Sequence, residues 1–221
     1  TWMLLALATA IVFPVVILVF FRNRPEDSGL TPDGNFTSKR KKQRTLFPVL
    51  KQNTSGEVLK SYAFWVFALM LALHGLLVTG LTFHIVSIFK EAGMVESEAV
   101  KIFLPISVIS IIVTFSFSSV SDYIHLKYLL FAMGGGALCS TIGIALLEQW
   151  DVALSMIILG SGITSGSFSV LTTITWPRYF GRTHLGAISG QATLMIVFGS
   201  ALGPVLFSTS LSRTGSYDLA A

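Results

Sequence analysis

Charged residues are scarce in this chain. They make up 12% of its 221 residues, whereas soluble domains usually contain about 25%. The single cysteine, Cys139, excludes an internal disulfide and most redox motifs. The sequence also lacks a cluster of His, Cys, Asp and Glu with metal-ligand spacing, so no metal site and no cofactor are expected. These shortages argue against a soluble redox or metal-dependent enzyme.

Other enzyme patterns are equally weak. Ser121, Asp122 and His125 are of the residue types found in catalytic triads, but adjacency in sequence is no indication of triad geometry. The glycine-rich runs "MGGGALC" and "GSGITSG" lack the Lys-Ser/Thr pair and the preceding strand of a phosphate-binding loop. They are typical of close helix packing. We therefore expect no enzymatic activity.

Long apolar runs dominate what is present. Hydrophobic residues form 52% of the chain, and six stretches contain no Asp, Glu, Lys or Arg. About 20 such residues cross the roughly 30 Å hydrocarbon layer as a helix. None of the stretches alternates in polarity as the strands of a membrane barrel do. The sequence predicts an all-α membrane protein with six transmembrane helices, at residues 1–21, 61–89, 102–120, 128–147, 152–175 and 186–207.

The basic residues indicate the orientation of these spans. One set of alternate loops carries twelve Lys and Arg, and comprises residues 22–60, 121–127 and 176–185. The other set carries three, and comprises residues 90–101, 148–151 and 208–221. Because basic loops stay in the cytoplasm, the first set is predicted to lie inside. The pI of 9.3 then reflects topology in a multi-pass protein of the cell membrane, with the lipid bilayer and not nucleic acid as its partner.

Three motifs resemble one transporter family. The segment "RNRPEDSGLTPDG", the basic loop after it and "AFWVFALMLALHGLLVTGLTFH" resemble the junction of helices 6 and 7 in the twelve-helix major facilitator superfamily, especially bacterial members similar to monocarboxylate and oxalate/formate carriers. The run "WPRYFGRTHLGAISG" resembles the family's loop between helices 10 and 11. Asp122 and Lys127 fit the motif after helix 8, although Ser118 and Tyr123 replace its Gly and Arg.

The resemblance implies a domain plan and a function. The six spans would be helices 6–11: residues 1–21 end the N-terminal half, 22–60 form the central cytoplasmic loop, and 61–221 form most of the C-terminal half with an outer tail. The chain, which opens inside an apolar run, is expected to be a fragment whose partner is the missing N-terminal half. The function implied is secondary transport of a small organic solute by alternating access. An organic anion and proton coupling are possibilities within it, and a non-transporting membrane sensor or scaffold of the same fold is the alternative.

Two histidines are the only ionisable side chains within the spans. Intramembrane ionisable groups are functional candidates because burying them is costly, so His74 and His84 are candidates for solute contact, and His74 also for proton coupling, while a hydrogen-bonded packing role is favoured for His84. A histidine hydrogen-bonded to a neighbouring helix is the competing interpretation. Ten residues separate them, which is about 15 Å along a helix. Weaker polar candidates, each of which also suits helix packing, are Thr79, Thr82, Ser107, Ser110, Thr114 and Gln191.

A second group of residues is predicted to act in packing or conformational change. Gly199 and Gly203 place two small residues on one helix face, and Pro204 favours a kink. The group also contains Asp122, Lys127, Arg178 and Arg182. The predicted helices 8 and 11 contain no Arg or Lys, so an anionic solute would need its counter-charge from protonated His74 or from the other half of the protein. An organic anion is favoured only by the family resemblance.

The topology can be tested by labelling. A cysteine introduced as Asn35→Cys is expected to resist a membrane-impermeant maleimide in intact cells and to react after permeabilisation, because residues 22–60 are predicted to face the cytoplasm. Rapid labelling in intact cells would overturn the orientation.

Overall fold

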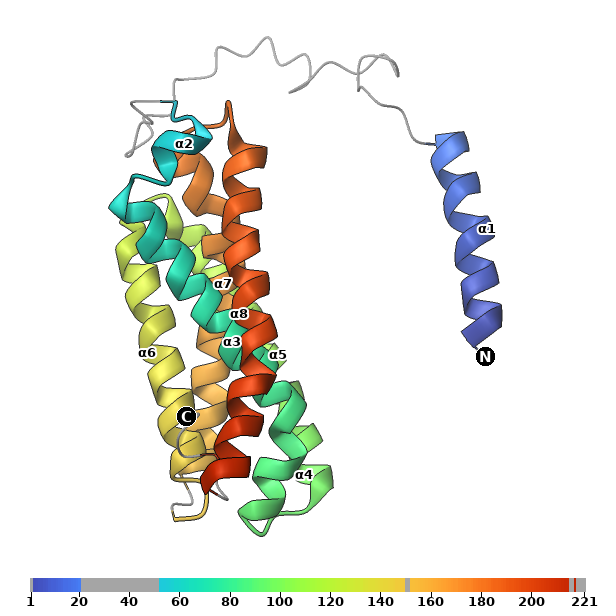
Figure 1. The fold of residues 1–221 in the computed structure, drawn as a ribbon, viewed down its shortest axis with the longest axis vertical. Helices are drawn as coiled ribbons and strands as arrows, with labels where there is room; N and C mark the ends of the chain where they lie inside the picture. The colour runs from blue at the N-terminus through green and yellow to red at the C-terminus, as the bar shows by residue number, and fades with distance from the viewer. Residues whose placement is uncertain (1, 21–51, 150–151, 215–216, 218–221) are drawn as a thin grey trace. The chain divides into compact units, whose positions relative to one another are not determined.

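The computed structural model describes residues 2–20, 52–149, 152–214 and 217, and this part of the chain folds into helices joined by turns, without a strand (Figure 1). The prediction of an all-α fold is confirmed for these residues. The chain divides into two units, residues 1–44 and 45–221. Most of the predicted central loop, including its basic run, lies outside the described residues.

The described part of the first unit is a single helix, α1 (Trp2–Phe20). Its 19 residues include no charged side chain, and Pro14 lies inside it. Large apolar side chains along it are exposed within the unit, as Leu18 is at 79%. An apolar helix of about this length approaches what a membrane crossing requires. A sixth transmembrane span at this position remains a prediction.

The second unit contains seven helices within its described residues. They are α2 (Ser55–Val58), α3 (Tyr62–Glu91), α4 (Glu96–Lys101), α5 (Phe103–Ser121), α6 (Leu126–Ala145), α7 (Ala153–Phe180) and α8 (Leu185–Thr214). Five helical segments, of which one joins α4 to α5, are long and apolar enough to cross a membrane. At 1.5 Å per residue the 30-residue α3 and α8 are about 45 Å long. They exceed the hydrocarbon thickness, so their ends reach the polar boundary or the helices tilt.

One clear difference from the predicted boundaries is at the end of α7. The predicted span ends at 175, but the helix continues to Phe180 and includes Pro177. Trp176 and Phe180 lie one turn apart on the same face and are both buried. Their rings pack against Phe64 at centroid distances of 5.5 and 6.4 Å. This aromatic packing stabilises the last turn in spite of the proline, which usually ends a helix.

The end of α8 differs in a similar way. It continues to Thr214, whereas the predicted span stops at 207 and leaves residues 208–221 as a tail. Helices α3, α5 and α6 begin and end within two residues of the predicted limits. Long apolar runs therefore predict the positions of the helices well. Where a helix continues past its apolar run, its last residue depends on packing against other helices, which the run itself does not reveal.

Glycines allow the helices of the second unit to approach closely. The most extensive contacts are those of α3 with α8, α6 with α7 and α5 with α7. Gly199 and Gly203 on α8 face the carbonyl groups of Ala72 and Leu76 on α3. Between α6 and α7, a Cβ placed on Gly160 would lie only 2.5 Å from the carbonyl oxygen of Gly136. Small residues of this kind are enriched at helix interfaces in membranes, where close packing drives association.

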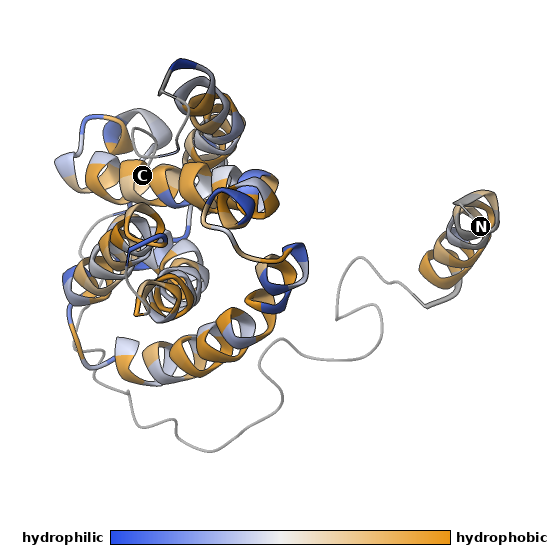
Figure 2. Cartoon of the chain, turned by 90° about the horizontal axis from the view of Figure 1, so that it is seen from below, coloured by the Kyte–Doolittle hydropathy of each residue, from blue (hydrophilic) through white to orange (hydrophobic). Residues whose placement is uncertain are grey.

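The core consists of two apolar clusters at different levels of the helix bundle. One contains Phe64 and Leu71 of α3, with residues from the start of α6 and the end of α7. The other contains Leu81 and Ile85 of α3, with residues from the end of α6 and the start of α7. Apolar residues also cover the outward faces of the helices, as Figure 2 shows, and Phe115 is 72% exposed. An apolar exterior of this kind suits a lipid environment.

The glycine contacts predict which substitutions destabilise the bundle. Gly203→Ala is expected to lower the free energy of unfolding by about 1–3 kcal/mol, because the new methyl group would collide with the backbone of α3. Gly190→Ala, on the same helix but facing open space, is the matched control. It is expected to be neutral or to stabilise, since alanine favours helices by up to about 1 kcal/mol over glycine. Thermal unfolding in detergent micelles measures both, and equal effects would contradict the packing.

Candidate functional site

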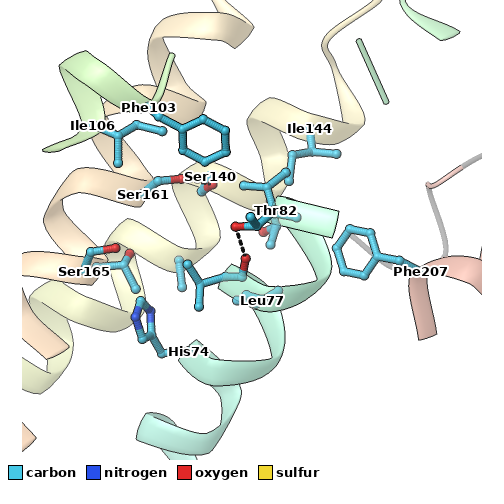
Figure 3. Close-up of a pocket in the computed structure, with 15 residues that line it drawn as sticks. His74, Leu77, Thr82, Phe103, Ile106, Ser140, Ile144, Ser161, Ser165 and Phe207 are labelled. Carbon is cyan, nitrogen blue, oxygen red and sulfur yellow. Dashed lines mark hydrogen bonds between the residues drawn. The ribbon is translucent and has the colours of Figure 1, made fainter. Parts of the chain in front are cut away.

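A cavity lies at the level between the two apolar clusters. Its volume is about 90 Å³, measured as the space open to the centre of a water-sized sphere, and the cavity opens to the outside. Its walls come from the middle of α3, α6 and α7, from the start of α5 and from one residue of α8 (Figure 3). The lining residues are His74, Leu77, Val78, Leu81, Thr82, Phe103, Ile106, Ala137, Ser140, Thr141, Ile144, Ser161, Thr164, Ser165 and Phe207.

Most of the polar groups in the cavity already have hydrogen-bond partners. Ser140 on α6 and Ser161 on α7 share a hydrogen bond of 2.9 Å. The hydroxyl of Thr164 donates to the carbonyl oxygen of Gly160 at 2.6 Å. Thr82 and Thr141 donate to carbonyl oxygens of their own helices, at 2.6 and 3.1 Å. The hydrogen bonds of these hydroxyl groups are therefore made within the protein.

His74 is the most distinctive residue of the cavity. It is buried, with 7% of its surface exposed, and its ring lies against that of Phe168 on α7 with centroids 4.4 Å apart. Among the residues that the structure describes, its side chain makes no hydrogen bond. No Asp, Glu, Lys or Arg lines the cavity. The predicted role of His74 in solute contact stays a prediction, and its position is compatible with that role.

His84 occupies a different environment from His74. Its Nε2 lies 3.3 Å from the carbonyl oxygen of Pro204, and its Nδ1 lies 3.2 Å from the hydroxyl of Tyr217. Since a carbonyl can only accept, Nε2 donates in the first of these contacts. The ring also stacks on Phe207 with centroids 5.9 Å apart. His84 does not line the cavity, and it joins α3 to α8.

The other polar candidates are spread over the bundle. Neither Thr79 nor the three residues of α5 line the cavity. On α5, Ser107 donates to the carbonyl of its own helix at Phe103. Thr114 donates across to Gly166 of α7 at 3.3 Å, and the carbonyl oxygen of Ser110 lies close to the same glycine. These contacts suit the packing interpretation of the α5 hydroxyls.

Gln191 lies on α8 beside the start of the second unit. Its amide Nε2 donates to the hydroxyl of Ser55 on α2 at 2.7 Å. Its Oε1 is buried without a hydrogen-bond partner among the described residues. Gln191 does not line the cavity, so the structure does not bring it together with His74.

Arg178, predicted to have a conformational or packing role, joins the end of α7 to the turn between α5 and α6. Its guanidinium donates to the carbonyl oxygens of Ser121 at 2.6 Å and Ile124 at 2.8 Å. The neighbouring Asp122 is exposed. Lys127 lies 5.2 Å from the ring centroid of Tyr128. The side chain of Arg178 therefore holds this turn by binding the backbone carbonyl groups of the turn. This contact does not require the Gly and Arg that Ser118 and Tyr123 replace in the motif.

Gln52 makes a contact that the sequence gives no reason to expect. Its Oε1 accepts hydrogen bonds from the backbone N–H groups of Arg182 at 2.8 Å and Thr183 at 3.2 Å, and from the Thr183 hydroxyl at 3.1 Å. The chain reaches this geometry through Gly181, whose φ of +86° favours glycine. Asn53 also donates from its backbone to Phe180 at 3.0 Å. Residues 52–53 are thus hydrogen-bonded to the turn between α7 and α8.

The sequence prediction missed the hydroxyls of α6 and α7 in the cavity. A usable signal was present, because Ser161, Ser165 and Phe168 recur at helical spacing and so share a face of α7. The run "GSGITSG", which the sequence offers as a packing face or a hinge, is not identified there as part of a cavity wall. It serves both purposes, since Gly160 and Gly162 contact α6 and α5 while the serines face the cavity.

Comparison with known proteins identifies one family. The family model described as Major Facilitator Superfamily matches residues 1–204. No curated protein and no solved structure matches the chain.

The role of Arg178 can be tested against a neighbouring arginine. Arg178→Gln is expected to cost about 1–3 kcal/mol of stability, because charged hydrogen bonds to two carbonyl groups are lost. Amide hydrogen exchange in residues 121–127 is then expected to accelerate. Arg182→Gln is the control, since Arg182 makes its contact with Gln52 through the backbone. Equal acceleration in the two variants would show that Arg178 does not hold the turn.

Proposed function

Because the chain belongs to the major facilitator superfamily, a family of membrane transporters, we propose that it forms part of a secondary active transporter of a small organic solute. The family match, which extends over residues 1–204, carries this proposal. It is a multi-pass membrane protein, and the part of the chain that the structure describes contains five helical segments suited to crossing. We place it in the cell membrane, where the solute is exposed alternately to the two sides.

The packing of the second unit supports the proposed numbering of its helices. Each half of these transporters contains two inverted repeats of three helices. With α3, α5 and α6 as one repeat and α7 and α8 as the start of the next, the contact of α3 with α8 is equivalent to that of α5 with α7. Both contacts are extensive. This symmetry supports α3, α5, α6, α7 and α8 as helices 7–11. We number α1 as helix 6 only because it precedes them in the chain.

The cavity is the best candidate for part of the solute site. It lies about halfway along α3, in the second half of α6 and in the first half of α7, and solute sites in such transporters lie near the bilayer midplane. Its volume of about 90 Å³ is below the roughly 300–1,000 Å³ of a complete ligand pocket. We propose that the other half of the protein supplies the remaining wall. Because the sequence resembles bacterial monocarboxylate and oxalate/formate carriers, monocarboxylates, oxalate and formate are the solutes to examine first.

Uptake into proteoliposomes tests this function. The full-length protein is expected to accumulate at least one small organic solute, and His74→Ala is expected to reduce that uptake or change its dependence on pH between roughly 5.5 and 8, a range around the ordinary histidine pKa of about 6.5. His184→Ala, an exposed histidine outside the cavity, is the control.

Two outcomes would contradict the proposal. Uptake that is identical in rate and pH profile for His74→Ala would remove His74 from the site. A folded protein that moves none of the solutes tested would instead favour a sensor or scaffold that has kept the transporter fold.

A further inference from the structure

The cavity has unused hydrogen-bonding capacity at one end. Of the seven polar residues that line it, five make side-chain hydrogen bonds within the described structure. The two that make none are His74 on α3 and Ser165 on α7. The His74 ring packs on Phe168, which lies three residues from Ser165 on α7, and Figure 3 shows both side chains away from the Ser140–Ser161 pair. The free groups therefore form a single polar spot in a mainly apolar cavity.

This polar spot can both donate and accept. A neutral imidazole provides one donor and one acceptor, and a serine hydroxyl provides one donor and two acceptor lone pairs. Buried polar groups normally have partners, because leaving one without a partner is costly. A ligand group that donates and accepts at the same time would satisfy both residues.

The residues around this polar spot favour an uncharged ligand group over a charged one. No charged residue lines the cavity, and Leu77, Phe103 and Ile106 provide apolar surface around it. An ionised carboxylate placed beside the neutral His74 ring would lose its hydration without meeting a Lys or Arg side chain, which is strongly unfavourable. An uncharged polar group loses much less and is repaid by hydrogen bonds.

We infer that this cavity binds the uncharged end of the transported solute, a primary amide or hydroxyl group carried on a small apolar or aromatic body, through His74 and Ser165. The inference rests on the proposed function only in taking the ligand to be the transported solute. The cavity of about 90 Å³ is small and open on one side, so it would hold the polar group and part of the body while the remainder extends out of it. If the solute also carries a carboxylate, that carboxylate lies outside this cavity.

Two probes of nearly the same shape separate charge from size. Benzamide presents an uncharged amide, and benzoate at neutral pH presents a carboxylate on the same ring. Binding of each is measured by titration calorimetry with the full-length protein in detergent micelles, for the unmodified protein, Ser165→Ala, His74→Phe and His74→Gln. Ser169→Ala, one turn along α7 at an exposed position, is the matched control. Thermal unfolding shows that each variant is folded.

The expected result is a specific loss of benzamide binding. Ser165→Ala and His74→Phe each weaken it about three- to tenfold, the effect of one hydrogen bond. His74→Gln, which keeps a donor and an acceptor, retains more binding than His74→Phe, and Ser169→Ala leaves binding unchanged. Benzoate either does not bind or binds equally to all variants.

Other results overturn the inference. Failure of benzamide to bind the folded, unmodified protein does so, as does benzamide binding that is insensitive to Ser165→Ala and His74→Phe. So does benzoate binding that these variants weaken as much as they weaken benzamide, because the carboxylate would then occupy the cavity. The uptake assay separates the two proposals. Benzamide binding of the expected kind without any solute uptake leaves the site standing and rejects transport, whereas uptake with insensitive benzamide binding rejects only the site.

Discussion

Close backbone contact between helices is the constraint on which the second unit depends. Apolar side chains gain little free energy when they move from lipid to a contact with another helix, because both surroundings are apolar. Helix association therefore relies on close packing and on hydrogen bonds between helices. Gly199 and Gly203 bring α8 against α3, and Gly136 and Gly160 bring α6 against α7. Where the helices are held this closely, larger side chains fill the core above and below. The cavity occupies the level between these two filled regions.

Hydroxyl groups in the bundle follow a second constraint, that of satisfying polar atoms in an apolar medium. Ser107, Ser116 and Ser119 on α5 all donate to carbonyl groups one turn earlier. This local bonding lets serine and threonine lie on lipid-facing surfaces at small cost. Against that background, a side chain without such a partner is informative. His74 is informative for this reason, and its burial alone would say much less.

The sequence predicts the positions of the helices well and the composition of the site only in part. Long uncharged runs identify α3, α5 and α6 to within two residues, because the cost of burying charge in lipid is large. The end of α7 is different, since aromatic packing of Trp176 and Phe180 on Phe64 outweighs a proline, and that packing joins distant parts of the chain. His74 is found from its ionisable side chain. Ser165 is not, because serines in membrane helices are common and only the fold shows which of them lack a partner.

The hydrogen bonds of Gln52 connect segments that are far apart in the sequence. Three donors of the α7–α8 turn converge on one amide oxygen, and Gln191 holds Ser55 a few residues later. Residues 52–55 are therefore attached both to the α7–α8 turn and to α8 before the chain enters α3, and just beyond them Trp65 of α3 donates to the carbonyl oxygen of Leu59 at 2.7 Å. The segment that leads into α3 thus joins the first long helix of the second unit to its last two.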